Sequence, residues 1–201
     1  MNSKTSLKET ADRIMKFSAK VLGMGLETHG KYIEEREGKK GLKKIEEKMK
    51  KLGYPLKFEE IKTFKYYPVG LADLVIIVAK EIFNWTEKDI FEMGNVAPKY
   101  SLFTKILAKY FLNLEQTTKE IPKYWRKHFT EGELEIELHK KEKNAIVHLE
   151  YNITHPLVCI FFAGYFLRIA TYVIKSPKIN IKETRCQFKG DSYHEFLISW
   201  Q

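Results

Sequence analysis

Residues 155–200 read HPLVCIFFAGYFLRIATYVIKSPKINIKETRCQFKGDSYHEFLISW, and this stretch largely decides how the chain is arranged. A helix is predicted from His155 to residue 174, with Thr154 as its N-cap and Pro156 tolerated in the first turn. The helix is apolar on nearly all sides, which is typical of a helix at the centre of a protein. Two strand-like runs, 178–188 and 194–200, lie on either side of Gly190 and predict a terminal β-hairpin.

The register of this hairpin predicts a candidate metal site. A three-residue loop centred on Gly190 would pair Cys186 with His194. Directly opposed Cβ atoms lie about 4.5–5.5 Å apart, so a thiolate and an imidazole there could bind one metal ion. Cys159, the other cysteine, lies on the helix expected to cover this face. Because strand side chains alternate, the face would carry Cys186, Phe188, His194, Phe196, Ile198 and Trp200.

The length and charge of the chain favour one domain with no nucleic-acid partner. With 201 residues and 44% hydrophobic content, the chain is long enough for one sizeable core and short for two full domains. The formal charge of +9 comes from 35 basic and 26 acidic residues, and lysines alternate with glutamates, as in 39–51. A solvated helix surface explains this pattern better than a nucleic-acid site, because arginines are few and scattered.

We expect a cytoplasmic protein without a membrane span. No uninterrupted apolar run reaches the roughly 18–20 residues needed to span a bilayer, since even 155–174 contains His155, Arg168 and Thr171. Charged residues occupy the N-terminus, where a signal peptide would be apolar. Two cysteines do not make a disulfide framework, so both are expected to be reduced thiols or metal ligands.

The remaining pattern predicts a run of helices followed by strands. Helices are expected over 5–22, 41–52, 69–83, 86–98, 98–112 and 113–129, the last with a bend at Pro122. Alternating residues predict strands over 133–139 and 145–151. The fold class is therefore α+β, a helical layer followed by a β-β-α-β-β antiparallel sheet with a buried central helix. Gly23 and Gly25 divide the chain into an N-terminal helical arm, 1–24, and a ligand-binding domain, 25–201.

The element order and the closing pattern Glu183-x-x-Cys186-x-x-x-Gly190-Asp191-x-x-His194-x-Phe196-x-Ile198 resemble a known superfamily. The chain looks like a member of the superfamily whose ligand-binding fold is shared by haem–nitric-oxide-binding domains, 4-vinyl-reductase-type domains of bacterial regulators and Golgi-transport tethering subunits. Within it, segments 85–94 and 125–132 and the pattern His155-Pro156-x-x-Cys159-x-x-x-x-Gly164-Tyr165 resemble the haem-less bacterial branch. The resemblance covers residues 25–200.

The resemblance implies a zinc site beside the ligand pocket. In the 4-vinyl-reductase-type regulators, cysteines help to bind a structural zinc ion, and His194 stands here where they have a second cysteine. Cys159, Cys186 and His194 are therefore the candidate zinc ligands. No fourth ligand is apparent, although Glu183 and His155 are available. Without a metal, both cysteines would be small buried residues and His194 would be hydrogen-bonded.

Despite this resemblance, we do not expect the protein to bind haem. The haem-binding branch carries a proximal histidine on a helix and a Tyr-x-Ser-x-Arg clamp further along the chain. Neither pattern occurs here, because segment 98–127 has no histidine and His128 sits at a helix end beside basic residues.

The expected function is a non-enzymatic sensory or regulatory domain that holds a small apolar molecule between helices and sheet. The chain has no glycine-rich phosphate loop, nucleophile elbow or His-Glu-x-x-His motif. Two alternatives are a homodimeric scaffold, with helix 5–22 paired to a second copy, and a tetrapyrrole-handling enzyme, implied only by the name of a related family. A further alternative is that the apolar helices simply pack together and leave no cavity. The candidate ligand-binding residues are Phe103, Leu107, Tyr110, Phe111, Phe162, Tyr165 and Phe166.

Overall fold

The computed structural model describes residues 6–100 and 113–201. Its first part contains mainly helices: α1 (Leu7–Ile14), α2 (Gly23–Lys51), α3 (Val69–Phe83) and α4 (Glu87–Tyr100), with short strands β1 (Lys20–Leu22) and β2 (Tyr66–Pro68) and the 3₁₀ turn η1 (Phe58–Glu60). The second part contains α6 (Leu114–His128), β3 (Glu133–His139), β4 (Asn144–Glu150), α7 (Pro156–Val173), β5 (Ile179–Arg185), the 3₁₀ turn η2 (Gln187–Lys189) and β6 (His194–Trp200). This order confirms the predicted α+β class.

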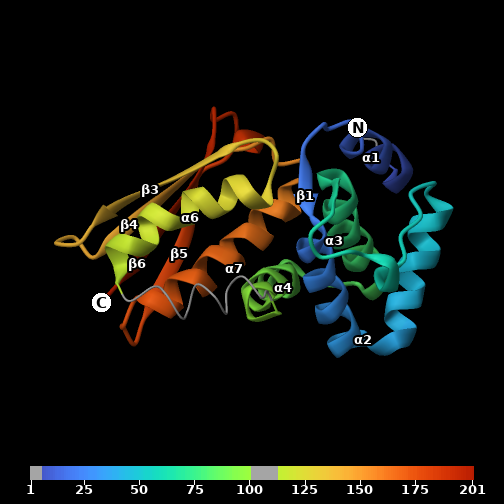
Figure 1. The fold of residues 1–201 in the computed structure, drawn as a ribbon, viewed down its shortest axis with the longest axis horizontal. Coiled ribbons are helices and arrows are strands. Elements are labelled where there is room, and N and C mark those ends of the chain that lie inside the picture. The colour runs from blue at the N-terminus through green and yellow to red at the C-terminus, as the bar shows by residue number, and fades with distance from the viewer. Residues whose placement is uncertain (1–5, 101–112) are drawn as a thin grey trace.

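The elements form a helical layer and a sheet with two helices on one face (Figure 1). Strands β3, β4, β6 and β5 lie in that order, and all neighbours are antiparallel. Helix α6 packs at the β3 side of the sheet and α7 at the β5 side. Helix α7 also packs along α4, so it is the central helix that joins the two layers.

One face of the sheet is buried and the other is polar, as period-two alternation requires. Val147 of β4 lies between Ile136 of β3 and Phe196 of β6, and Leu149 pairs with both Leu134 and His194. All of these except the half-buried Ile136 are buried, on the side that faces α6 and α7. His194 is therefore a polar side chain on a mainly apolar face.

Two glycines allow α4 and α7 to cross closely. A Cβ atom at Gly94 would lie 1.9 Å from the Phe161 carbonyl oxygen, and one at Gly164 would lie 2.0 Å from the Phe91 carbonyl oxygen. Asn95 donates a side-chain hydrogen bond to the Gly164 carbonyl, and the Arg168 guanidinium binds back to Asn95. This crossing fixes how the helical layer sits on the sheet layer.

The N-terminal segment differs from the single helix predicted over 5–22. Residues 7–22 form helix α1 and strand β1 instead. Ala11 and Ile14 of α1 are fully buried in the common core, and Val21 of β1 pairs with Tyr67 of β2. The apolar positions that suggested a free amphipathic helix are therefore used inside the protein.

The terminal hairpin also differs from the prediction. Arg185 pairs with Glu195, as the predicted register requires, but the ladder ends there instead of continuing to Cys186 and His194, and a bulge before Arg185 shifts the rest of β5 so that Glu183 pairs with Phe196. The turn is longer than three residues because η2 precedes Gly190, whose φ is +98°, and because the Asp191 side chain accepts a hydrogen bond from the Cys186 amide. Phe188 is 42% exposed instead of facing the helix.

Four helices need smaller corrections. His155, not Thr154, caps α7, because its Nδ1 accepts a hydrogen bond from the Leu157 amide. Helix α4 continues through Pro98, and α6 continues through Pro122. Helix α2 begins at Gly23 and includes the predicted 41–52 helix after a kink at Gly38, whose φ is +69°.

Helix α7 is long and apolar enough, by length and composition alone, to cross a membrane, although no membrane-spanning segment was predicted. Half of that 18-residue segment is buried inside the protein. Its packing on α4 and β5 is that of a core helix.

Candidate ligand cavity and metal centre

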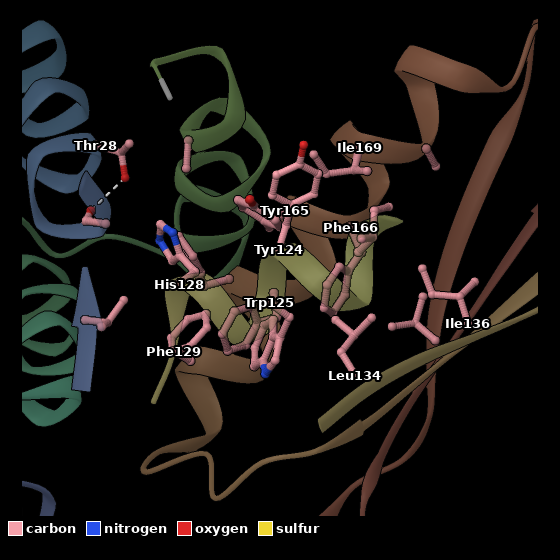
Figure 2. A pocket seen from close by; sticks show the side chains of 18 of the residues that line it. Thr28, Tyr124, Trp125, His128, Phe129, Leu134, Ile136, Tyr165, Phe166 and Ile169 are labelled. Atoms are coloured by element: carbon pink, nitrogen blue, oxygen red, sulfur yellow. Dashed lines mark hydrogen bonds between the residues drawn. The ribbon is translucent and has the colours of Figure 1, made fainter. Parts of the chain in front are cut away.

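An apolar cavity of about 140 Å³ lies between the helical layer and the sheet layer. Its walls come from β1, α2, α3 and α4 on one side and from α6, α7, β3, β4 and β6 on the other. Figure 2 shows His128 and Thr28 near α2, and Leu134 and Ile136 on the sheet side. Apolar side chains dominate the lining, which is the usual composition of small-molecule sites.

Three of the candidate ligand-binding residues line this cavity. Phe162, Tyr165 and Phe166 all lie in its wall, and the Phe162 and Phe166 rings stack with centroids 5.8 Å apart. They come from α7, whose buried face is turned toward the sheet and α6. Their role in binding remains a prediction. The other four candidates, Phe103, Leu107, Tyr110 and Phe111, lie outside the described residues.

Two histidines at the cavity are neutral imidazoles. Burial lowers the pKa of His29 and of His128 to about 4, because an apolar environment disfavours the charged ring. His29 donates to the backbone of Ala72, and its Nδ1 has no partner in the described part of the chain. His128, at the end of α6, makes an edge contact with Phe129 and has no hydrogen-bond partner among the described residues.

Further polar side chains line the cavity, among them Asp73 and Tyr165. Asp73 is 5% exposed, and Thr154 Oγ1 donates a hydrogen bond of 2.7 Å to its Oδ2. Burial raises the pKa of Asp73 to about 7, even though the hydrogen bond from Thr154 lowers it. Burial also raises the pKa of Tyr165 to about 12. These groups place hydrogen-bonding capacity at a few points of an apolar wall.

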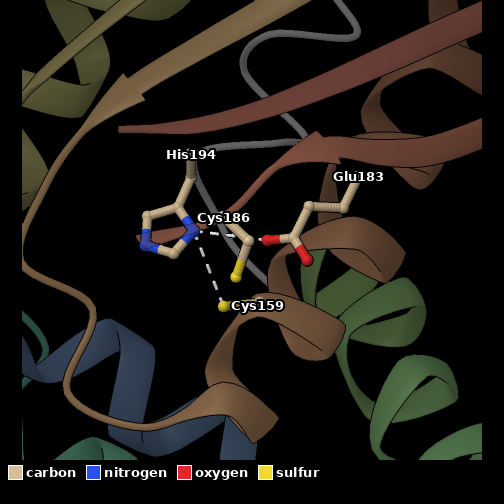
Figure 3. Close-up of side chains that lie close together, drawn as sticks. All are labelled: Cys159, Glu183, Cys186 and His194. Carbon is tan, nitrogen blue, oxygen red and sulfur yellow. Dashed lines mark hydrogen bonds and ion pairs between the residues drawn. The ribbon is translucent and has the colours of Figure 1, made fainter. Parts of the chain in front are cut away.

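The candidate metal ligands meet beside the first turns of α7 (Figure 3). The donor atoms of Cys159, Glu183, Cys186 and His194 all lie within 4.8 Å of one another. His194 Nδ1 is 3.7 Å from Cys159 Sγ and 3.2 Å from Glu183 Oε1. The three residues predicted from the sequence are thus brought together by α7, β6 and the turn after β5, and Glu183 of β5 joins them.

The surroundings explain why Glu183 joins the cluster and His155 does not. His155 uses its Nδ1 to cap α7. Glu183 faces His194, because the bulge between Glu183 and Arg185 shifts the strand register at this end of the sheet. The longer turn then returns Cys186 to the same cluster without direct cross-strand pairing.

The protonation states differ between the thiols and the carboxylate. Burial raises the pKa of both Cys159 and Cys186, so without a metal both thiols are protonated at neutral pH. Burial would also raise the pKa of Glu183, but hydrogen bonds from His194 and Cys186 outweigh it and hold this pKa below its usual value. A divalent cation would reverse the thiol preference, since thiolate is the form that binds metal.

This donor set fits a tetrahedral zinc ion. Bond lengths of about 2.3 Å to sulfur and 2.0–2.1 Å to nitrogen imply donor separations of about 3.3–3.8 Å. The observed separations, 4.8 Å at most, need only a small contraction. Two sulfurs, one imidazole nitrogen and one carboxylate oxygen are all ligands that zinc accepts.

Sequence reasoning missed the polar groups of the cavity. His128 was set aside because it adjoins basic residues, yet its ring lies against the cavity while Arg126 is exposed. Asp73 could have been found, since a lone carboxyl group inside the apolar helix 69–83 must have a buried role. The His29 side chain gives no such signal, because its position depends on how α2 packs against α3.

Solved structures with a similar fold include H-NOX proteins. No protein-family model and no curated protein matches the chain. An H-NOX protein from S. oneidensis in the Fe(II)NO ligation state has a TM-score of 0.69 at 12% identity, covering 90% of this chain and 99% of that chain. A doubly substituted Tt H-NOX has a TM-score of 0.64 at 13% identity, with coverage of 90% and 95%. A third structure, from work on heme distortion in the H-NOX family, has a TM-score of 0.61 at 14% identity, with coverage of 89% and 94%.

These comparisons confirm the H-NOX-like fold and correct one expectation. The sequence led us not to expect haem, whereas structures with this fold are described in Fe(II) and Fe(II)NO states. The earlier expectation rested on two missing sequence patterns and is contradicted by this likeness. The finer resemblance, to 4-vinyl-reductase-type domains and to a haem-less branch, stays a prediction.

Proposed function

We propose that this protein is a sensory domain that binds a small molecule in the cavity between its two layers, and that it acts by binding instead of catalysis. One observation carries the proposal: a cavity of about 140 Å³ is lined from both layers, mainly by apolar side chains. A ligand there contacts α2 and α3 on one side and α6, α7 and the sheet on the other. Its presence would change how the two layers pack, which is what a sensor requires.

Haem is one ligand to test, because the H-NOX structures are described by their iron states. The donors present fit haem in one respect, since neutral imidazole is a common axial ligand and His128 has an open ring at the cavity. His128 would hold the iron, and the apolar lining would surround the macrocycle. Bound haem would supply an iron atom able to take a diatomic gas. Haem is larger than the cavity, so its entry requires the layers to move apart.

A smaller apolar molecule is the other ligand class. An engineered cavity of about 150 Å³ in another protein is large enough for benzene, and the cavity here is of similar size. The walls include the rings of Trp125, Phe129 and Phe162, which lie in stacked, tilted and edge contact with one another. A single-ring compound therefore fits the cavity without movement of the layers.

Native mass spectrometry tests the proposal. Protein expressed with and without a haem precursor should retain a small molecule, either haem or a lighter ligand. Ala170→Phe places a ring in the cavity and should abolish retention of the small molecule. Thr171→Phe, at the exposed neighbouring position on α7, should leave retention unchanged. Protein that carries no small molecule in either preparation, and whose thermal stability does not rise with haem or ring compounds, would overturn the proposal.

We also propose a structural zinc centre at Cys159, Glu183, Cys186 and His194, supported by their convergence within 4.8 Å. Zinc would tie α7 to the terminal hairpin, close to the Phe162 and Phe166 walls of the cavity. Elemental analysis of protein purified without chelator or histidine tag should give one zinc ion per chain. Acid should release the metal and free both thiols, because protonated thiols do not bind zinc.

A further inference from the structure

Asp73 presents a carboxyl group to the cavity with only part of its hydrogen-bonding capacity used. It lies in the apolar interior of α3, is 5% exposed and lines the cavity. Thr154 Oγ1 donates to Oδ2, and no described residue donates to Oδ1. The described cavity lining contains no lysine or arginine that could pair with the carboxylate.

The bond to Thr154 does not by itself account for this carboxyl group. It ties α3 to the segment before α7, and a neutral amide or hydroxyl at position 73 would make the same tie. A buried carboxylate with a free oxygen is costly, and burial raises the pKa of Asp73 to about 7. A ligand that donates a hydrogen bond to Oδ1 would remove this cost.

His29 lies on the same wall as Asp73 and also has an acceptor that lacks a hydrogen-bond donor among the described residues. Its ring donates to the backbone of Ala72, the residue before Asp73. The ring is neutral, so Nδ1 is an acceptor, and it is buried without a partner in the described part of the chain. The wall formed by α2 and α3 therefore offers two acceptors within an apolar surface.

We infer that the cavity selects a single-ring molecule whose head group, an amine or a hydroxyl, donates a hydrogen bond to Asp73. This inference rests on the proposed function and specifies its ligand class. The cavity volume of about 140 Å³ sets the size of the ring, and the apolar lining binds its body. The acceptors on α2 and α3 set the polarity of the head, because a site with unpaired acceptors rejects an analogue that lacks the donor.

Matched probes on the unaltered protein provide the test. Phenol and toluene differ by a hydroxyl against a methyl group, and benzylamine and ethylbenzene by an amine against a methyl group. Benzoate has the same ring but only accepts hydrogen bonds at neutral pH. Calorimetric titration should show phenol and benzylamine binding at least about 10-fold more tightly than their hydrocarbon partners, with benzoate weakest.

Variants of Asp73 separate charge from hydrogen bonding. Asp73→Asn keeps an acceptor but removes the charge. The variant should therefore bind benzylamine about 10-fold or more weakly than the unaltered protein does, while its affinity for phenol should change by no more than a few-fold. Asp73→Leu removes the acceptor and should bring phenol and toluene to equal affinity. Glu81→Gln, at an exposed position on the same helix, is the matched control and should change neither ratio.

The outcomes separate this inference from the proposed function. If toluene and ethylbenzene bind as tightly as phenol and benzylamine, the cavity binds ligands but the inference is wrong. Tightest binding of benzoate would likewise overturn it. If none of the probes binds, the inference is overturned, while the native mass spectrum reports separately on whether the protein carries a ligand.

Discussion

His194 is the single residue on which the zinc centre depends most, because its Nδ1 lies between Cys159 and Glu183. In zinc-loaded protein, His194→Ala should release the metal and lower the free energy of unfolding by several kcal/mol. Without zinc, the loss should be about 1–3 kcal/mol, from partners left unpaired in a buried site. Elemental analysis and urea unfolding measure both effects.

The control for this variant is His139→Ala, at a histidine with a 42% exposed side chain on β3. It should change neither the metal content nor the stability. Zinc far below one ion per chain in chelator-free preparations, with both cysteines titrating as free thiols, would contradict the zinc centre and leave the cavity proposal intact.

Asp73 also predicts a pH dependence of stability. Its pKa is about 7 in the folded protein and near 3.8 when unfolded, so the unfolded chain loses its proton first as pH rises. The contribution of neutral Asp73 to the free energy of unfolding is therefore greatest below pH 4 and decreases as the pH rises to about 7. His29 and His128, whose pKa values are about 4 when folded, act in the opposite direction over part of this range.

Comparison with Asp73→Asn isolates the Asp73 contribution, because the histidines are unchanged. The difference in unfolding free energy, unaltered protein minus variant, should fall by on the order of 3 kcal/mol between pH 4 and pH 7.5. Urea unfolding at closely spaced pH values measures it. A difference that is constant with pH would show that Asp73 is not buried as described.

Among individual residues, those that follow a local rule could be predicted. Cys159 lies on the buried face of a strongly apolar helix, and His194 lies on the inward-facing positions of β6, so each was placed from its own element. Glu183 joins them through a bulge that no sequence rule located. His29 and His128 become cavity residues only when α2 and α6 meet across the two layers.

At the scale of secondary-structure elements, the crossing of α4 and α7 controls the position of both cavity walls. Gly94→Ala would place a methyl group against the Phe161 carbonyl oxygen, where the gap is only 1.9 Å. The helices must separate, which should cost at least about 2–3 kcal/mol of unfolding free energy. Gly190→Asn, where nothing lies within 4 Å and the backbone is in the left-handed region that asparagine tolerates, should cost much less. Equal thermal stability of both variants would contradict the described crossing.

Elements with complete local signals were predicted with correct bounds. Helix α3 starts directly after Pro68 and ends at Asn84 in the left-handed conformation, and β3 alternates through all its residues. Segment 5–22 was mistaken for one helix because its apolar spacing continues across the break before β1. The pairing of β1 with β2 and with Phe129 is a tertiary effect, which helical periodicity cannot reveal.

At the scale of the whole molecule, the homodimer remains a prediction, but the structure removes the observation that first suggested it. The apolar face of α1, expected to meet a second copy, packs against α3 instead. A dimer would therefore use another surface and should survive deletion of residues 1–5, which precede α1. Light scattering at tens of micromolar should give twice 23.7 kDa. A monomer at that concentration would contradict the prediction.

The most direct measurement of the central claim is a crystal structure of the protein under xenon pressure. Apolar cavities of this size take up xenon, and its anomalous signal locates it without ambiguity. The account predicts an ordered xenon atom between α2, α6 and α7, near Trp125, Phe162 and Val158, in crystals free of other ligand. The same space filled by side chains, or xenon bound elsewhere and absent there, would contradict a small-molecule site between the two layers.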